Sequence, residues 1–274
     1  MKTISIIGAG AVGRSIALAL FYSRVKIDGI YSENGISART LAKKVHCNNF
    51  GKLNSEASLS EIVILAVPDS QIKNVAELLA KNFVLLKNRI VFHTSGALTS
   101  DAIGVLRKKR AVVASFHPLQ TFSRSKEQTS LKNIWCAVEG DRKAVAAARE
   151  IGKKLQMNIF TVSKNDKSLY HVSAVFASNY LVTLLSVVET ISEHIHISKK
   201  NIWKIYSPLI FQTIHNAVNS SPASALTGPI VRGDVETIAK HIKALSIPPL
   251  KHLAVLYSVI GIETTRLAKK KNAR

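Results

Sequence analysis

Cysteine is scarce in this chain: its 274 residues include two, Cys47 and Cys136. His46 lies directly beside Cys47, which is not a zinc-ligand spacing, so structural zinc is excluded and no metal site is expected. So few cysteines also exclude a disulfide scaffold and fit a reducing compartment. We therefore expect a cytoplasmic protein.

Acidic residues are also few, because 17 Asp and Glu stand against 38 Lys and Arg, which gives a formal net charge of +21. Such an excess attracts phosphates, nucleic acid or acidic lipid. The densest basic runs, at 107–110 and 269–271, lack the interleaved aromatic residues and the helix-turn-helix, zinc-finger or RNP patterns of nucleic-acid binders. No specific nucleic-acid partner is expected.

Internal repeats and low-complexity segments are absent, and hydrophobic residues make up 47% of the chain. That is enough apolar surface for a folded core, which excludes intrinsic disorder as the main state. The N-terminal apolar run is not a signal peptide, since three glycines and Arg14 interrupt it. Residues 168–188 have no basic or acidic side chain except His171, but their serines and Asn179 favour a helix buried between domains or subunits over a membrane partner.

The first part of the chain alternates short β-branched runs with amphipathic stretches, which is typical of βαβ units. The expected strands are 3–7, 25–31, 62–67, 89–93 and 111–116, with 134–138 and 158–162 as later additions that are candidates for antiparallel pairing; a strand just after Cys47 is poorly marked. The expected helices between them are 11–22, 37–45, 70–82, 101–107 and 142–156. This pattern predicts an α/β fold with a doubly wound, mostly parallel Rossmann sheet.

Beyond residue 163 the strand pattern stops and helical periodicity takes over, at 164–194, 198–218, 234–245 and 250–270. A stretch rich in Gly, Pro and Ser interrupts these helices near 220–229. The sequence therefore predicts a dinucleotide-binding domain over 1–163. An all-helical domain for substrate binding and dimerisation is expected over 164–274.

A phosphate-binding turn opens the chain. Gly8, Gly10 and Gly13 form the pattern G-x-G-x-x-G directly after an apolar strand, and Ala11 and Val12 begin the following helix. In this context the glycines permit a tight turn, close approach of a pyrophosphate and close packing of helix on strand. The helix N-terminus then offers free N–H groups to the phosphates. We expect a bound dinucleotide.

The identity of the coenzyme depends on the end of the second strand. Glu33 lies about 20 residues beyond the last glycine, where an acidic residue holds the ribose hydroxyl of NAD. Ser32 and Arg39, with two nearby lysines, are instead able to surround the 2′-phosphate of NADP. NADP is the coenzyme we favour, and NAD stays open.

The next strand ends at Val67 and Pro68, which are expected to border the coenzyme, because ligands of doubly wound sheets bind beyond the carboxyl ends of the strands. Asp69 follows as a candidate cap for the next helix.

Two polar clusters follow the next two strands. His117, locked by Pro118, is the candidate general acid or base that moves the proton accompanying a hydride. Ser95 is expected to contact the coenzyme and to hydrogen-bond a substrate oxygen or His117; an ordinary loop serine is its alternative. His93 is expected to lie in the strand as a buried, hydrogen-bonded histidine.

In the helical part, Lys167, His171 and Ser178 fall on one helix face, with Asn179 at its edge. We expect His171 and Asn179 to contribute to catalysis, although an internal network between helices is equally compatible with His171.

Further along the chain, Arg232 is a natural partner for a substrate carboxylate, and Thr227 is able to present a backbone donor to the same substrate. Asp234 is expected to cap the next helix or to pair with Arg232.

The sequence closely resembles a bacterial family of Rossmann-like proteins with a helical C-terminal domain of unknown function. The resemblance rests on Gly8–Gly13, Ala66–Asp69, His93–Leu98, Ser115–Phe122, Tyr170–Leu184 and Ala225–Asp234. It implies a helical domain like that of 6-phosphogluconate dehydrogenases, NADP binding, and a homodimer built through the helices. The segment around His117 and Pro118 also resembles the His-Pro segment of prephenate dehydrogenases, and the glycine turn is similar to that of pyrroline-5-carboxylate reductases. Two departures are Glu33, where NADP-binding relatives often have Arg, and His171, where hydroxyacid dehydrogenases have Asn.

These observations predict an NAD(P)-dependent oxidoreductase that transfers a hydride between NADP(H) and a small anionic hydroxy, keto or imino substrate. A non-catalytic protein that binds NADP(H) and reports redox state to a partner is the alternative. A basic nucleic-acid binder is the third hypothesis, and it predicts binding that weakens steeply with salt.

Overall fold

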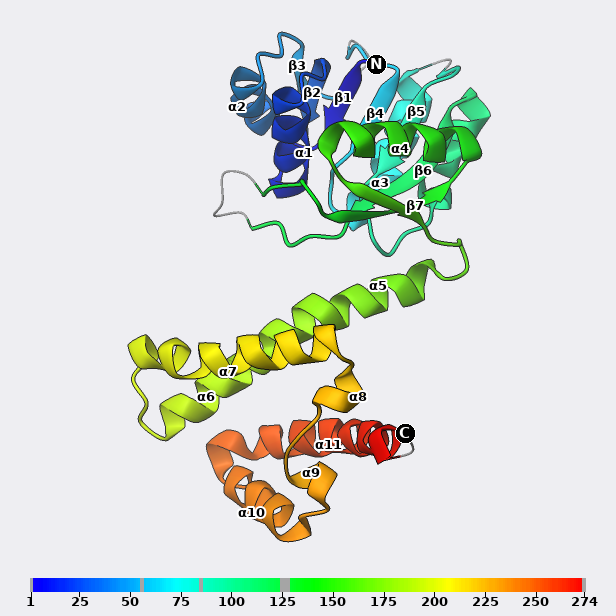
Figure 1. The fold of residues 1–274 in the computed structure, drawn as a ribbon. Helices are drawn as coiled ribbons and strands as arrows, with labels where there is room; N and C mark the ends of the chain where they lie inside the picture. The colour runs from blue at the N-terminus through cyan, green and yellow to red at the C-terminus, as the bar shows by residue number, and fades with distance from the viewer. Residues whose placement is uncertain (1, 55–56, 84–85, 124–128, 273–274) are drawn as a thin grey trace. The chain divides into compact units, whose positions relative to one another are not determined.

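The computed structural model describes residues 2–54, 57–83, 86–123 and 129–272. The chain divides into two compact units, Met1–Ser178 and Asn179–Arg274 (Figure 1).

The first unit is built on one sheet of eight strands in the order β3-β2-β1-β4-β5-β6-β7-β8. The strands are β1 (Ile4–Ile7), β2 (Ile27–Ser32), β3 (Phe50–Lys52), β4 (Ile62–Leu65), β5 (Ile90–His93), β6 (Val112–Pro118), β7 (Trp135–Gly140) and β8 (Asn158–Thr161). The first six run parallel, β7 pairs antiparallel with β6, and β8 pairs parallel with β7. The strand order reverses between β1 and β4, which is the switch point where doubly wound sheets bind dinucleotides.

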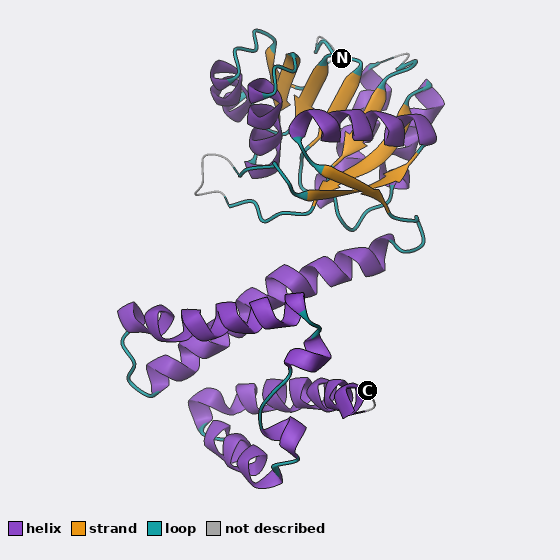
Figure 2. Cartoon of the chain, viewed as in Figure 1, coloured by secondary structure: helices purple, strands orange, loops and turns teal. Residues whose placement is uncertain are grey.

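Helices cover both faces of this sheet, as its fully buried central strands require (Figure 2). One apolar core joins the sheet to α1 (Ala11–Tyr22), α2 (Ile36–Lys44) and α4 (Arg142–Leu155). The other core joins it to α3 (Asp69–Asn82) and to η1 (Ser100–Lys109), a 3-10 helix. The doubly wound, mostly parallel sheet predicted from the sequence is therefore confirmed.

The local differences from prediction have physical reasons. Strand β3 forms although its three residues carry little β pattern, because pairing with β2 supplies its hydrogen bonds. Strand β6 continues through His117 and Pro118, since antiparallel pairing with β7 holds this end. The expected helix 101–107 is the longer 3-10 segment η1.

Helix α5 (Lys167–Val175) packs with the first unit, so the two units divide at 178/179 and not at 163/164, where the strand pattern ends. The reason is a set of contacts from Lys167, Tyr170 and His171 to the sheet domain. These contacts bring α5 to the carboxyl end of β6.

The second unit is helical, as predicted. Its helices are α6 (Leu181–His194), α7 (Lys199–Asn219), α8 (Pro222–Ala225), α9 (Pro229–Arg232), α10 (Val235–Leu245), η3 (Pro248–Leu250) and α11 (Lys251–Asn272). Asp234 caps α10 as expected, because its carboxylate accepts from the backbone N–H of Thr237 at 3.0 Å. A small core around Leu245, Leu250 and Leu253 joins α10 to α11.

Helix α5 continues through the π-helical segment η2 (Phe176–Tyr180) into α6, which makes one helix of 28 residues, Lys167–His194. By length and composition this helix is able to cross a membrane: its most apolar window has a mean hydropathy of 1.5 and is 0% buried within the chain. The apolar run expected to be a buried helix is therefore uncovered in the single chain.

Candidate functional site

The glycine turn after β1 has the geometry that a pyrophosphate requires. Gly8 adopts a φ of +105°, and a Cβ at this position would collide with the backbone carbonyl of Ala66. A Cβ at Gly13 would collide with the carbonyl of Gly8, so this glycine allows α1 to pack closely on the turn. Gly10, in contrast, occupies the N-cap position of α1, where no side chain hydrogen-bonds the free backbone N–H groups. A Cβ at Gly10 would meet nothing within 4 Å. The N-terminus of α1, with Ala11 and Val12 in its first turn, is thus open to a phosphate.

A pocket of about 380 Å³ lies at this turn, on the switch point of the sheet. Its lining includes seven residues from the turn and from the ends of β2, β3 and β4: Gly8, Gly10, Ser32, Glu33, Lys52, Val67 and Pro68. Of the expected coenzyme residues, five line this pocket: Gly8, Gly10, Ser32, Val67 and Pro68. The others, Ala11, Val12, Gly13, Arg39 and Ser95, are not among its lining residues, and Arg39 lies over the ring of Phe50 at 6.0 Å. Lys52 contributes a positive charge to the lining of the pocket. The sequence does not predict this role, because β3, which ends at Lys52, carries little strand pattern. These residues fit a dinucleotide.

Ser95 follows β5 and is held by three hydrogen bonds. Its hydroxyl donates to Oδ2 of Asp69 at 2.6 Å and accepts from the backbone N–H groups of Ala97 and Leu98 at 3.2 and 3.0 Å. The hydroxyl hydrogen is thus directed to Asp69 and not to His117. Asp69 does not cap α3: the N-cap is Pro68, and the Asp69 carboxylate accepts from the hydroxyl of Ser95.

His93 is buried at the end of β5 and fully hydrogen-bonded, as expected. Its Nδ1 accepts from the backbone N–H of Ser95 at 3.3 Å, so the proton lies on Nε2, which donates to the carbonyl of Thr99 at 3.0 Å. Burial lowers the pKa of His93 to about 4, and Lys167 adds to the effect.

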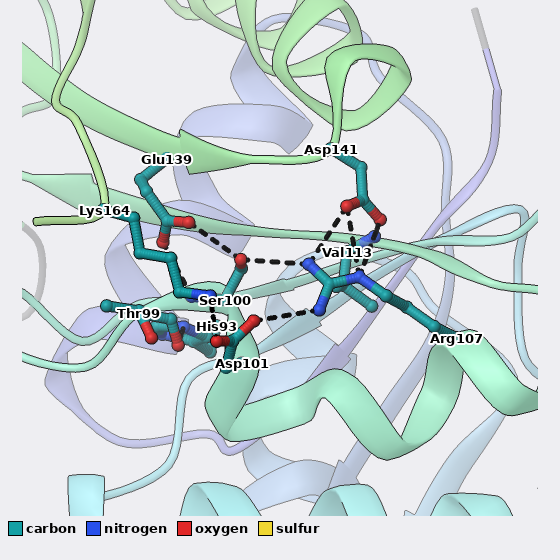
Figure 3. Close-up of polar contacts among 9 residues, drawn as sticks. All are labelled: His93, Thr99, Ser100, Asp101, Arg107, Val113, Glu139, Asp141 and Lys164. Atoms are coloured by element: carbon teal, nitrogen blue, oxygen red, sulfur yellow. Dashed lines mark hydrogen bonds and ion pairs between the residues drawn. The ribbon is translucent and has the colours of Figure 1, made fainter.

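A polar network fixes the loop that follows His93 (Figure 3). Ser100 donates from its backbone N–H and from its hydroxyl to the buried carboxylate of Glu139, at 2.6 and 2.8 Å. Arg107 joins the hydroxyl of Ser100 to the carboxylates of Asp101 and Asp141. Because η1 is tied to β7 in this way, the loop between His93 and Ser100 is held rigidly beside β6.

The neutral state of buried His93 makes stability depend on pH. Its folded pKa of about 4 lies below the ordinary 6.5, so the unfolded chain binds more protons between these values, and stability falls as pH drops through this window. The loss from His93 alone is about 3 kcal/mol by pH 4. Thermal unfolding followed from pH 7.5 to 4.5 is expected to show a falling Tm, and the slope is expected to be smaller in His93→Gln, which does not titrate. An equal slope in the variant would exclude His93 as the cause.

His117 lies next to the end of β6 and is held by a residue of α5. Its Nδ1 is 2.7 Å from the hydroxyl of Tyr170, and the two rings are nearly perpendicular, at 79°. Burial lowers the pKa of His117 to about 4, and the nearby Lys167 and His171 lower it further. The imidazole is therefore neutral at physiological pH before ligands bind.

Lys167 is fully buried at the start of α5 and donates to the hydroxyl of Ser115, which is also fully buried. Its ammonium lies 5.6 Å from the centre of the Tyr170 ring. Burial lowers the pKa of this lysine, and the Glu139 carboxylate opposes the shift. Lys167 therefore places a positive charge close enough to His93 and His117 to lower the pKa of both.

Gly96 allows His117 and His171 to approach each other. A Cβ at this position would lie 2.8 Å from Nε2 of His117 and 2.5 Å from Nδ1 of His171, and the two rings are 6.1 Å apart. Lys167 and His171, which were predicted to share one helix face, both contact residues of β6. Tyr170 and Gly96 were missed as site residues; the helical spacing of residues 167, 170 and 171 is the sequence signal for the tyrosine.

Three predicted site residues, Asn179, Thr227 and Arg232, belong to the second unit. Asn179 is exposed in η2, Thr227 precedes α9, and Arg232 ends it. Their roles in catalysis and substrate binding stay predictions. Among the described residues, no group of three or more His, Cys, Asp or Glu side chains is arranged to hold a metal ion.

Comparison with known proteins agrees with this architecture. Residues 2–118 match a Rossmann-like domain, and residues 134–264 match a domain of unknown function, DUF2520. The chain combines a Rossmann-like domain with a DUF2520 domain. The search of curated proteins finds no match.

Solved structures share this two-part fold over nearly the whole chain. The "putative NADP oxidoreductase BF3122" of Bacteroides fragilis is 24% identical with a TM-score of 0.77, over 97% of this chain and 98% of that one. Protein TM1727 of Thermotoga maritima is 26% identical with a TM-score of 0.75, over 98% and 99%. A pyrroline-5-carboxylate reductase of Coxiella burnetii is 16% identical with a TM-score of 0.60, over 98% of both chains. At these identities the DUF2520 chain shares the fold of NAD(P)-dependent oxidoreductases.

Proposed function

We propose that this DUF2520 protein is an oxidoreductase that transfers a hydride between NADP(H) and a small anionic hydroxy, keto or imino substrate. The observation that carries the proposal is the position of His117 at the same sheet edge as the glycine turn. The turn follows β1, the Ser95 loop follows β5, and His117 lies near the end of β6, all at the carboxyl ends of parallel strands. When bound, the nicotinamide would supply or accept the hydride, while His117 would hydrogen-bond the reacting atom of the substrate and stabilise the charge that develops there.

An anionic substrate fits the charge of the site. Lys167 is buried beside Ser115, and its charge contributes to lowering the pKa of both His93 and His117. The Glu139 carboxylate opposes this charge at Lys167, and the Asp69 carboxylate, which accepts from Ser95, opposes it more weakly than Lys167 acts on both histidines. The potential at the histidines is therefore positive, which favours a carboxylate or a developing alkoxide.

The proposed coenzyme is NADP(H). Lys52 lines the pocket next to Ser32, where a cation is able to pair with the 2′-phosphate. Glu33 lines the same pocket and favours the free ribose hydroxyl of NAD(H). Both coenzymes therefore belong in the test.

The experiment is a screen of small 2-keto acids, 2-hydroxy acids and cyclic imino acids with each coenzyme, followed by nicotinamide absorbance. Turnover that His117→Gln lacks would support the proposal. Tight binding of NADP(H) without turnover of any class would favour the alternative, a non-catalytic protein that senses the redox state of the coenzyme.

We also propose a homodimer formed through the helical unit. The most apolar window of helix Lys167–His194 is 0% buried, and α7 exposes Leu209, Phe211 and Val218 at 64%, 69% and 77%. An apolar groove of about 320 Å³, lined by residues of α6 and α11 among others, lies in the same unit. Exposed apolar faces of this extent are typical of subunit interfaces, and a second copy supplies a matching apolar face. A cytoplasmic location accords with such an assembly.

The dimer is tested by light scattering on the purified protein. Twice the chain mass is expected for the wild type, and Val182→Glu, on the exposed face of α6, is expected to shift the population to monomer. A monomeric wild type at micromolar concentration contradicts this assignment.

A further inference from the structure

We propose that Tyr170 is a positioning residue that fixes the tautomer of His117, so that Nε2 carries the proton and donates to the reacting atom of the substrate. This inference rests on the proposed function, because it specifies how His117 meets the substrate.

The geometry of the pair is closely constrained. The Tyr170 hydroxyl lies 2.7 Å from Nδ1 of His117. The ring of Tyr170 packs at its other side against Phe160, with centres 5.8 Å apart, and lies near the ammonium of Lys167. Tyr170 is thus held between β8 and the buried lysine, and its hydroxyl has little freedom to turn away from His117.

The hydrogen bond runs from tyrosine to histidine. Burial raises the pKa of Tyr170 to about 12, so the phenol keeps its proton. His117 is neutral at physiological pH, so one of its nitrogens is an acceptor. The lone pair of an imidazole nitrogen is a much better acceptor than a phenol oxygen, so Tyr170 donates to Nδ1. The proton of His117 is then on Nε2.

The other ring nitrogen of His117 is unpaired. Nε2 has no hydrogen-bond partner among the described residues and is not one of the polar atoms sealed inside the protein. It lies against Gly96, where a Cβ would be 2.8 Å away, so a side chain at this position would collide with the ring. Nδ1 of His171, on the other side of Gly96, is sealed and has no partner among the described residues.

A hydrogen-bond donor at Nε2 determines which kinds of substrate atom are able to bind there. A carbonyl or hydroxyl oxygen accepts from Nε2–H, whereas an ammonium or iminium group offers only donors. A cation there would also face the positive field of Lys167. The neutral imidazole keeps its own proton: it stabilises the alkoxide that forms as the hydride moves, and the alkoxide exchanges a proton with solvent. Among the substrate classes of the proposed function, the pair therefore favours keto compounds and the hydroxy compounds to which they are reduced.

The test reads the tautomer of His117 directly, by nitrogen NMR of protein labelled in its histidines, with His117→Gln identifying the signals. The wild type is expected to show a pyridine-type Nδ1 and a protonated Nε2. In Tyr170→Phe the acceptor loses its donor, and the spectrum is expected to move toward a mixture of tautomers.

The second unit contains a matched control. Tyr257 and His241 form the same kind of pair, with the hydroxyl 2.8 Å from Nδ1 and ring centres 5.8 Å apart. Tyr257→Phe is expected to change the signals of His241 and to leave those of His117 and the turnover unchanged. Tyr170→Phe is expected to lower kcat about tenfold, less than removal of His117 itself, with an unchanged KM for the coenzyme.

A protonated Nδ1 on His117 in the wild type would overturn the proposal. So would a His117 tautomer that is the same in Tyr170→Phe, or turnover confined to imino substrates. The NMR measurement needs no substrate, so it decides the role of Tyr170 even if no turnover is found. A lack of turnover would count against the proposed function and not against the role of Tyr170.

Discussion

Gly10→Asp is expected to leave the fold intact and to abolish binding of the dinucleotide. A side chain at this position meets nothing within 4 Å, and the backbone has an ordinary φ of −73°. Aspartate is also a favourable N-cap residue, so Tm is expected to stay equal or to rise slightly. The carboxylate, however, occupies the N-terminus of α1 and repels the phosphates, so the affinity is expected to fall about 100-fold or more, which is about 2.8 kcal/mol.

The control for this result is Gly13→Ala, five residues after the first glycine of the same turn. Its Cβ would collide with the carbonyl of Gly8, which is backbone and cannot move aside without opening the turn. This variant is therefore expected to lose stability, measured as a lower Tm. If Gly10→Asp unfolded the protein or bound coenzyme like the wild type, the turn would not be the phosphate site.

His117→Ala is expected to lower kcat by about 10²–10³-fold, the usual cost of removing one donor that stabilises a developing oxyanion. Coenzyme affinity is expected to stay within about twofold of the wild-type value, because the glycine pocket has no lining contribution from His117. The loss is expected to appear in kcat and in kcat/KM for the substrate, measured by steady-state kinetics with the best substrate of the screen.

The matched control is His241→Ala, which removes a histidine from a similar tyrosine pair in the second unit. It is expected to retain full activity. If His117→Ala retained full activity, His117 would have no role in the reaction. The positive charge of Lys167 would then act on no catalytic residue.

The fold is largely predictable from the sequence because its signals are local. Buried strands such as Ile62–Leu65 are continuous apolar runs, and helix Ala11–Tyr22 follows the glycine turn over the residues that the pattern indicates. Strand Phe50–Lys52 escapes prediction because its pairing with β2, and not its composition, makes it a strand. The end of the first unit is not predictable from the sequence for a similar reason, since the contacts of α5 with the sheet determine where the unit ends.

The site is predictable only in part. The sequence places His117 at a strand end and puts Lys167 and His171 on one helix face, because both follow from the period of the element. It does not reveal that Ser95 donates to Asp69, 26 residues away, or that Tyr170 reaches His117, 53 residues away. The first pair depends on how the loop after β5 lies against α3, and the second on how α5 packs against β6; no local pattern encodes either.

This fold is expected to bind a nicotinamide dinucleotide at the glycine turn. The purified wild-type protein and Gly10→Asp are titrated in parallel with NADPH, NADH, NADP and NAD, following nicotinamide fluorescence and thermal stabilisation. The wild type is expected to show saturable binding, tightest for NADPH, which Gly10→Asp lacks. If none of the four coenzymes bound, or if the variant bound as well as the wild type, the glycine turn would not be a dinucleotide site.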